Sequence, residues 1–185
     1  MTSPAMLKAL ELHTPKGELP ANAEPEQIAL FRQANQLRAS LLDDSWPKKV
    51  AAFRRLYLLS EHNNPSPAVL STSRQMLHRA MLDEERDETF YAAGAGDLSG
   101  TVDGLLDLIY VALGWLLELG FTPQQIDLLM EEVHASNMTK TDDHGAPVFD
   151  TNGKVLKGDN YVRESLLKMV AAFSVGLSVG DIEHG

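Results

Sequence analysis

The sequence predicts an all-α protein, an antiparallel helical bundle with a long C-terminal loop. Apolar residues recur every three or four positions over most of residues 25–173. Proline, serine and threonine stand where helices would begin, and glycine stands where they would end. Because the 185 residues include no cysteine, disulfides and cysteine-ligated metals are excluded. The net charge of −10 argues against nucleic acid as a partner.

We expect residues 1–24, which are rich in proline, to form a flexible N-terminal segment. Residues 25–173 should form the helical domain, and residues 174–185 a loose tail. Within the domain, the apolar spacing predicts a first helix over residues 25–42. A second helix should run from Ser45 or Trp46 to about residue 62, with Pro47 in its first turn.

A third helix is predicted over residues 67–93, ended by a glycine-rich turn, and a fourth over residues 99–119. The motif Thr122-Pro123-Gln124-Gln125 predicts a capping box that begins a fifth helix, ending near residue 138. Residues 139–160 form a long segment in which Asn152-Gly153 favours a small hairpin. A last helix is predicted over residues 161–173.

No targeting or membrane-spanning segment is predicted. Residues 1–13 lack the continuous apolar stretch of a signal peptide. The most apolar run, residues 105–119, contains Asp107 and Glu118 and is too short to span a bilayer. We therefore expect a cytoplasmic protein with no membrane partner.

Carboxylates continue the apolar stripe of the third predicted helix. Leu77 and Met81 are followed at helical spacing by Glu84 or Glu85, and then by Glu88. Like charges at these spacings repel each other, and a divalent cation would reverse that effect. The alternative is that the acidic run from residue 83 to 88 is simply a solvated face.

The fourth predicted helix is apolar nearly all round, a pattern typical of a buried helix. Asp103 and Asp107 lie four residues apart on one face of it. A buried carboxylate must be paired, protonated or bound to metal, and no Lys or Arg occurs between Arg86 and Lys140. Asp103 could instead cap the start of this helix.

Two neighbouring antiparallel helices would bring these acid sets face to face. A cage of four or five carboxylates, with no nitrogen or sulfur ligand, suits Mg²⁺ or Mn²⁺. A di-iron site is disfavoured, because no histidine follows the acids at Glu-x-x-His spacing.

At these residues the chain resembles the all-α nucleoside triphosphate pyrophosphohydrolases, the MazG-like superfamily that includes dimeric dUTPases and phosphoribosyl-ATP pyrophosphohydrolase. The family signature is ExxE on one helix and ExxD on the next. Residues 85–88 resemble the first element, and Asp107, within the sequence DLIYV, resembles the aspartate of the second. Gly104 stands where the family has glutamate, and Asp103 could substitute for it. Residues 132–140 and 153–161 also resemble family segments, and the match covers about residues 48–173.

The resemblance implies metal-dependent hydrolysis of a nucleoside triphosphate to a monophosphate and pyrophosphate, which would clean or adjust a nucleotide pool and fits a phage. Substrates of the dGTP type and of the dUTP or dCTP type remain open. The resemblance implies that Glu84 or Glu85 would act as the base. The implied metal ligands are five carboxylates: Glu84, Glu85, Glu88, Asp103 and Asp107.

The resemblance also implies substrate-binding residues and self-association as a homodimer or homotetramer. The implied substrate contacts are Asn137, Lys140, Lys154, Lys157 and Tyr161. Each has a plainer alternative, as a surface lysine, a helix end or a core anchor. The competing hypothesis for the whole chain is a catalytically inactive bundle that binds nucleotide or acts as a scaffold, with Gly104 as the lesion.

Overall fold

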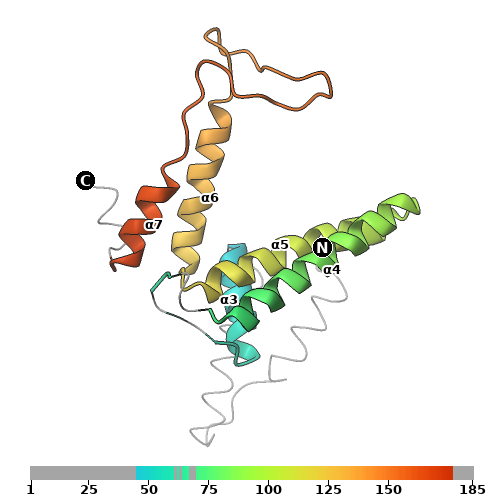
Figure 1. Ribbon diagram of the computed structural model, residues 1–185, viewed down its shortest axis with the longest axis vertical. Coiled ribbons are helices and arrows are strands. Elements are labelled where there is room, and N and C mark those ends of the chain that lie inside the picture. Colours follow the sequence, from blue (N-terminus) through green and yellow to red (C-terminus); the bar gives the residue numbers. More distant parts are fainter. Residues whose placement is uncertain (1–44, 61, 63, 67–69, 177–185) are drawn as a thin grey trace, which may run out of the picture. The chain divides into compact units, whose positions relative to one another are not determined.

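The computed structural model describes residues 45–176 except residues 61, 63 and 67–69. This part of the chain is all-helical, which confirms the expected fold class (Figure 1). The expected N-terminal segment, the helix over residues 25–42 and most of the tail lie outside the described residues. The chain divides into two units, Met1–Leu59 and Ser60–Gly185. The described helices are α3 (Trp46–Leu56), α4 (Thr72–Gly94), α5 (Leu98–Glu118), α6 (Pro123–Met138) and α7 (Leu166–Ser174).

Helix α3 belongs to the first unit and ends at Leu56, earlier than residue 62, where the apolar spacing places its end. The reason is local, because Leu58 adopts a left-handed backbone with φ of 52°. The amide of Leu59 then donates a hydrogen bond to the carbonyl oxygen of Arg54 at 2.9 Å. This hydrogen bond closes the last turn, and the helix ends there.

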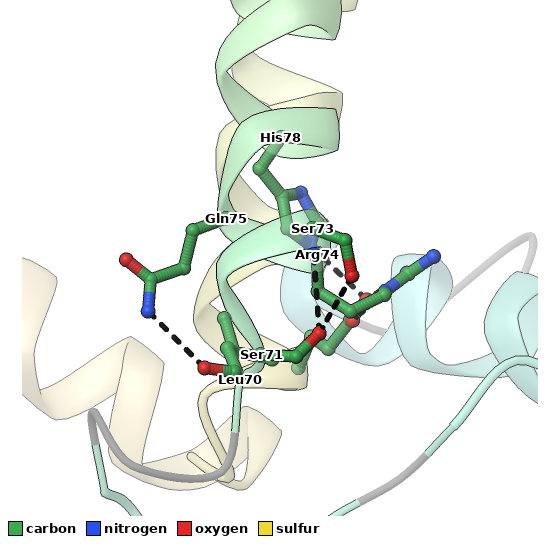
Figure 2. A network of polar contacts seen from close by, with 7 residues as sticks. Leu70, Ser71, Ser73, Arg74, Gln75 and His78 are labelled. Carbon is green, nitrogen blue, oxygen red and sulfur yellow. Dashed lines mark hydrogen bonds and ion pairs between the residues drawn. The ribbon is translucent and has the colours of Figure 1, made fainter.

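Helix α4 begins at Thr72, five residues later than expected, because Ser71 is its N-cap. The Ser71 hydroxyl accepts a hydrogen bond from the amide of Arg74 at 3.3 Å. Gln75 donates from its side chain to the carbonyl oxygen of Leu70 at 3.1 Å (Figure 2). The first bond satisfies one of the amides that a helix start leaves open, and the second ties the first turn to the residue before the N-cap.

Helices α4 and α5 lie side by side as an antiparallel hairpin (Figure 1). The expected glycine-rich turn joins them: Gly96 has φ of 73°, and Asp97 caps α5 by accepting a hydrogen bond from the amide of Gly100 at 3.0 Å. The register is fixed at both ends. Glycines of α5 lie against α4 near the turn, and polar side chains join the two helices at the other end.

The far end of the hairpin is held by a buried acid. Glu118 is fully buried on α5. Its carboxylate accepts two hydrogen bonds from the guanidinium of Arg74 on α4, at 2.6 and 2.7 Å. The same carboxylate lies 3.1 Å from Nε2 of His78. The ring of His78 stacks on Trp115, with ring centroids 5.3 Å apart.

The expectation that α5 is buried on all sides is wrong for the described chain. Leu106 is 57% exposed and Ile109 is 56% exposed, because α4 covers one face of α5 and leaves the others open. By length and mean hydropathy, α5 is also the one described helix that could cross a membrane. That test is weak evidence, since the core helix of a soluble protein passes it too.

Helix α6 begins with the capping box that the sequence predicts. The Thr122 hydroxyl accepts a hydrogen bond from the amide of Gln125 at 3.2 Å, and the Gln125 side chain accepts one from the amide of Thr122 at 2.9 Å. Ile126, in the next turn, is fully buried.

Replacing Thr122 with alanine should lower the free energy of unfolding by about 1 kcal/mol, because a backbone amide of α6 loses its partner. Urea denaturation followed by circular dichroism measures the change. Thr151→Ala, in an exposed loop, is the matched control and should leave the midpoint unchanged. An equal midpoint for Thr122→Ala and the wild type would contradict the capping role.

Helix α7 begins at Leu166 and packs against α6, whereas the sequence predicts a start at residue 161. The amide of Ser165 donates to the carboxylate of Glu132 at 2.6 Å, and the hydroxyl of Ser136 donates to the carbonyl oxygen of Val162 at 2.8 Å. These bonds hold residues 161–165 extended along α6. An apolar cavity of about 500 Å³ lies beside the two helices, lined among others by Leu116, Leu119, Phe121, Met130, Val133 and Val170.

Candidate active site on the hairpin

The α4 face that meets α5 is not the apolar stripe expected from the sequence. Leu77 is 43% exposed and Tyr91 is 83% exposed. The buried residues of α4 are instead His78 and Thr89. Glu85 lies one helical turn before Thr89 and is half-buried. Glu85, and not Glu84, is therefore the carboxylate on the inner face.

Four other carboxylates act on Glu85. Partial burial raises the pKa of Glu85 first, and the negative charge of Asp107 raises it next. The charges of Glu88, Glu84 and Asp103 then raise the same pKa further. Because the interaction between charges falls with distance, these five carboxylates from two helices form one electrostatic cluster.

Glu84, Glu88, Asp103 and Asp107 are exposed, so the expectation that the two aspartates lie on a buried face is wrong. Asp103 does not cap α5, because Asp97 does. It lies in the second turn of the helix, one turn before Asp107. Both aspartates lie on the same side of the face of α5 that carries Gly104, which is buried.

The cluster lacks a compensating cation among the described residues. Arg86, the one basic residue within the acidic run, turns to Asp83 and Asp87, at 2.7 and 2.8 Å. Oxygen-only donors with excess negative charge fit Mg²⁺ or Mn²⁺. In the part of the chain that the structure describes, no group of three or more acids or histidines is arranged to hold a metal. Like charges at this spacing repel, and a bound cation would offset that repulsion.

Replacing Glu85 with glutamine should stabilise the metal-free protein at neutral pH. The folded chain holds the pKa of Glu85 above its ordinary value of 4.5. The ionised group therefore opposes folding progressively as the pH rises above 4.5 through the folded pKa. The gain from glutamine should vanish below about pH 4.5.

Melting temperatures of both proteins in EDTA, measured from acid to neutral pH, check this expectation. A variant that melts at a lower temperature than the wild type at neutral pH would contradict it. So would a difference that does not change with pH.

The expected substrate-binding residues lie on α6 and the following loop. Asn137 is exposed in the last turn of α6, and Lys140 is half-buried just after it. The Lys157 ammonium lies 4.4 Å from the ring centroid of Tyr161. The Tyr161 hydroxyl donates to Glu164 at 3.2 Å. Lys154 is exposed beside the hairpin turn.

The loop carries two turns with the same hydrogen bonds. Asp142 Oδ1 accepts from the amides of residues 144 and 146, and Asp150 Oδ1 accepts from the amides of residues 152 and 154. The expected hairpin is confirmed only as an isolated bridge between Phe149 and Val155. Among the described residues, no ion pair or hydrogen bond links the loop lysines to the acid cluster, so their contact with substrate stays a prediction.

The sequence predicted no role for two residues of the hairpin. Thr89 is buried next to Glu88, and its hydroxyl donates to the carbonyl oxygen of Glu85 at 2.7 Å. Glu118 is buried at the far end of the hairpin. One sequence signal could have predicted either residue, namely a polar side chain at a position that repeats with the inner face of its helix.

Comparison with known proteins supports the resemblance stated above. Residues 50–137 match the family described as phosphoribosyl-ATP pyrophosphohydrolase. The matched segment includes α4, α5 and nearly all of α6, and therefore the whole acid cluster. No curated protein matches the chain significantly.

Proposed function

We propose that the chain hydrolyses nucleoside triphosphates with the help of Mg²⁺ or Mn²⁺. The premise is that residues 50–137, which match the phosphoribosyl-ATP pyrophosphohydrolase family, are a pyrophosphohydrolase domain of the MazG-like superfamily. The domain itself indicates a pyrophosphohydrolase acting on nucleotides. The choice of triphosphate and of metal is our proposal. The observation that carries it is the cluster of five carboxylates shared by two adjacent helices, in which the other four act on Glu85.

Glu85, Glu88 and Asp107 would hold the divalent metal, with Asp103 and Glu84 beside them. A divalent metal bound there would neutralise phosphate charge and lower the pKa of water. In the proposed reaction, a water oxygen bonds to the α-phosphorus while the bond from that phosphorus to the bridging oxygen breaks. The products are the nucleoside monophosphate and pyrophosphate.

A carboxylate of the cluster would take the proton from the attacking water. Glu85 would take this role only where it does not bind the metal, because a bound cation lowers the pKa that burial and the neighbouring carboxylates raise. Glu84 is the alternative base, and its exposed position leaves it free to turn.

Lys140, Lys154 and Lys157 would bind the β- and γ-phosphates, since an ammonium on a flexible stem acts as a mobile point charge. Asn137 would contact the sugar or base, and Tyr161 would support the loop by its contact with Lys157. The loop of residues 139–165 has the length typical of functional loops.

A nucleotide panel tests the proposed function directly. Pyrophosphate release should be measured with ribo- and deoxynucleoside triphosphates, including dGTP, dUTP and dCTP, with Mg²⁺, Mn²⁺ or EDTA. We expect metal-dependent turnover of at least one nucleotide. A folded chain that turns over none of them would favour the inactive nucleotide-binding or scaffold protein.

We also propose that the chain is a homodimer or homotetramer. Large apolar side chains of the hairpin are exposed, Phe90 at 71% and Ile109 at 56%, and burying them against a second copy of the chain would remove them from water. Light scattering after size exclusion should give a multiple of 20.3 kDa. Ile109→Glu should shift the mass toward one chain, and a monomeric wild type would contradict the proposal.

A further inference from the structure

Gly104 is the point of close approach between the two helices that carry the acids. Gly104 is buried on α5. A Cβ atom built on it would lie 2.3 Å from the hydroxyl oxygen of Thr89, and 3.2 Å from both Cα and Cβ of the same residue. The Cα and Cβ atoms of Thr89 could move away only if the backbone of α4 moved with them. Any side chain at position 104 would therefore push the helices apart, because the residues at the contact set the distance between packed helices.

Thr89 meets Gly104 in a defined conformation. Its hydroxyl donates to the carbonyl oxygen of Glu85, one turn back along α4, at 2.7 Å. This bond keeps the hydroxyl against its own helix and turned toward α5. The Thr89 side chain is buried, so it has no other space into which to turn.

The contact lies in the middle of the acid cluster. Glu88 directly precedes Thr89 in the sequence, and Asp103 directly precedes Gly104. Glu85 and Asp107 lie one turn away on either helix, and the charge of Asp107 acts on Glu85 more strongly than that of any other acid. Separating the helices at this contact would separate the two acid sets directly.

We propose that Thr89 and Gly104 are positioning residues that set the separation of α4 and α5, and with it the distance between the acid sets. On this view Gly104 is not a lesion. The position that carries glutamate in the family signature is occupied here by a spacer, and the neighbouring Asp103 supplies the second acid of α5. This inference rests on the proposed function, because it concerns the same metal site.

Two substitutions at position 104 separate a spacer from a lost ligand. If Gly104 only marked the loss of a glutamate ligand, Gly104→Glu would restore the family signature and tighten metal binding. As a spacer, Gly104→Ala and Gly104→Glu should each raise the Mn²⁺ dissociation constant, measured by calorimetry, by about tenfold or more. The Mn²⁺ concentration that gives half-maximal pyrophosphate release should rise with it.

Changes at Thr89 test the same contact from the other helix. Thr89→Ser keeps the hydroxyl and should keep wild-type Mn²⁺ affinity, whereas Thr89→Leu enlarges the side chain and should weaken it. The double variant Gly104→Ala with Thr89→Ala removes the hydroxyl that the new methyl group meets. It should recover only part of the affinity that Gly104→Ala loses, because Cα and Cβ of residue 89 still lie 3.2 Å from the new methyl group.

Two controls separate positioning from general destabilisation. Gly94→Ala is the same change on α4, at a site where an added Cβ meets no atom within 4 Å, and it should leave Mn²⁺ affinity unchanged. Ile126→Val should lower the melting temperature by trimming the core of α6 while Mn²⁺ affinity stays the same.

The outcomes distinguish this inference from the proposed function. With an active wild type, unchanged Mn²⁺ affinity in Gly104→Ala, or tighter binding in Gly104→Glu, would overturn the spacer role and leave the pyrophosphohydrolase standing. A wild type that neither binds Mn²⁺ nor turns over a nucleotide would overturn both. If the single variants at position 104 fail to fold, Thr89→Leu against Thr89→Ser decides the question.

Discussion

Replacing Glu88 with glutamine, or Asp107 with asparagine, is expected to lower kcat for pyrophosphate release by more than about 100-fold. Substitutions of groups that only support a metal ligand typically cost 10- to 100-fold, so loss of a ligand should cost more. Each change also removes one negative charge from the cluster around Glu85. The amide oxygen that remains is a weaker ligand for Mg²⁺ than a carboxylate. Initial rates at saturating nucleotide and increasing Mg²⁺ measure the effect.

The matched control lies on the same helix. Asp87 is exposed and pairs with Arg86 at 2.8 Å, on the side of α4 away from the cluster. Asp87→Asn should leave kcat within about twofold of the wild type, because the pair is a surface ion pair of little energetic weight. Equal rates for Glu88→Gln, Asp107→Asn and the wild type, all properly folded, would exclude this cluster as the active site.

The largest effect on stability is expected at Glu118. Glu118→Ala leaves His78 buried without that partner, and it leaves the guanidinium of Arg74 without the carboxylate that accepts two of its hydrogen bonds. Breaking a buried ion pair from one side costs about 3–5 kcal/mol. Arg74 is 39% exposed and can regain water, so we expect a loss of about 3 kcal/mol. Urea denaturation at neutral pH measures it.

Glu131→Ala is the control for charge and helix propensity. Glu131 is exposed on α6, and its substitution should change the free energy of unfolding by less than about 0.5 kcal/mol. A loss below about 1 kcal/mol for Glu118→Ala would mean that the hairpin does not depend on this network. Double substitution with Arg74→Ala should cost less than the sum of the two single changes, because the two residues share one interaction.

The sequence predicts helix ends well where the signal is local. The capping box at Thr122 and the glycine turn at Gly96 both lie where short-range chemistry places them. The start of α7 could not be predicted in this way. Its position depends on hydrogen bonds between residues 162–165 and α6, which join positions 26 and 33 residues apart.

The acid cluster could be predicted, but the face that presents it could not. The residues that α4 buries against α5 include His78 and Thr89, whose polarity hides the inner face from a hydrophobic pattern. The apolar residues of α5 gave a misleading signal of burial, because α4 covers one face of that helix and leaves residues such as Leu106 and Ile109 exposed. The role of Gly104 requires the distance to Thr89, which no sequence pattern contains.

Anomalous scattering from Mn²⁺ in crystals grown with a non-hydrolysable nucleoside triphosphate would test the central claim most directly. We expect a manganese peak between α4 and α5, within bonding distance of carboxylate oxygens of Glu85 or Glu88 and of Asp107, with the phosphates of the nucleotide beside it. A nucleotide bound elsewhere on the chain, with no manganese at the hairpin, would contradict it.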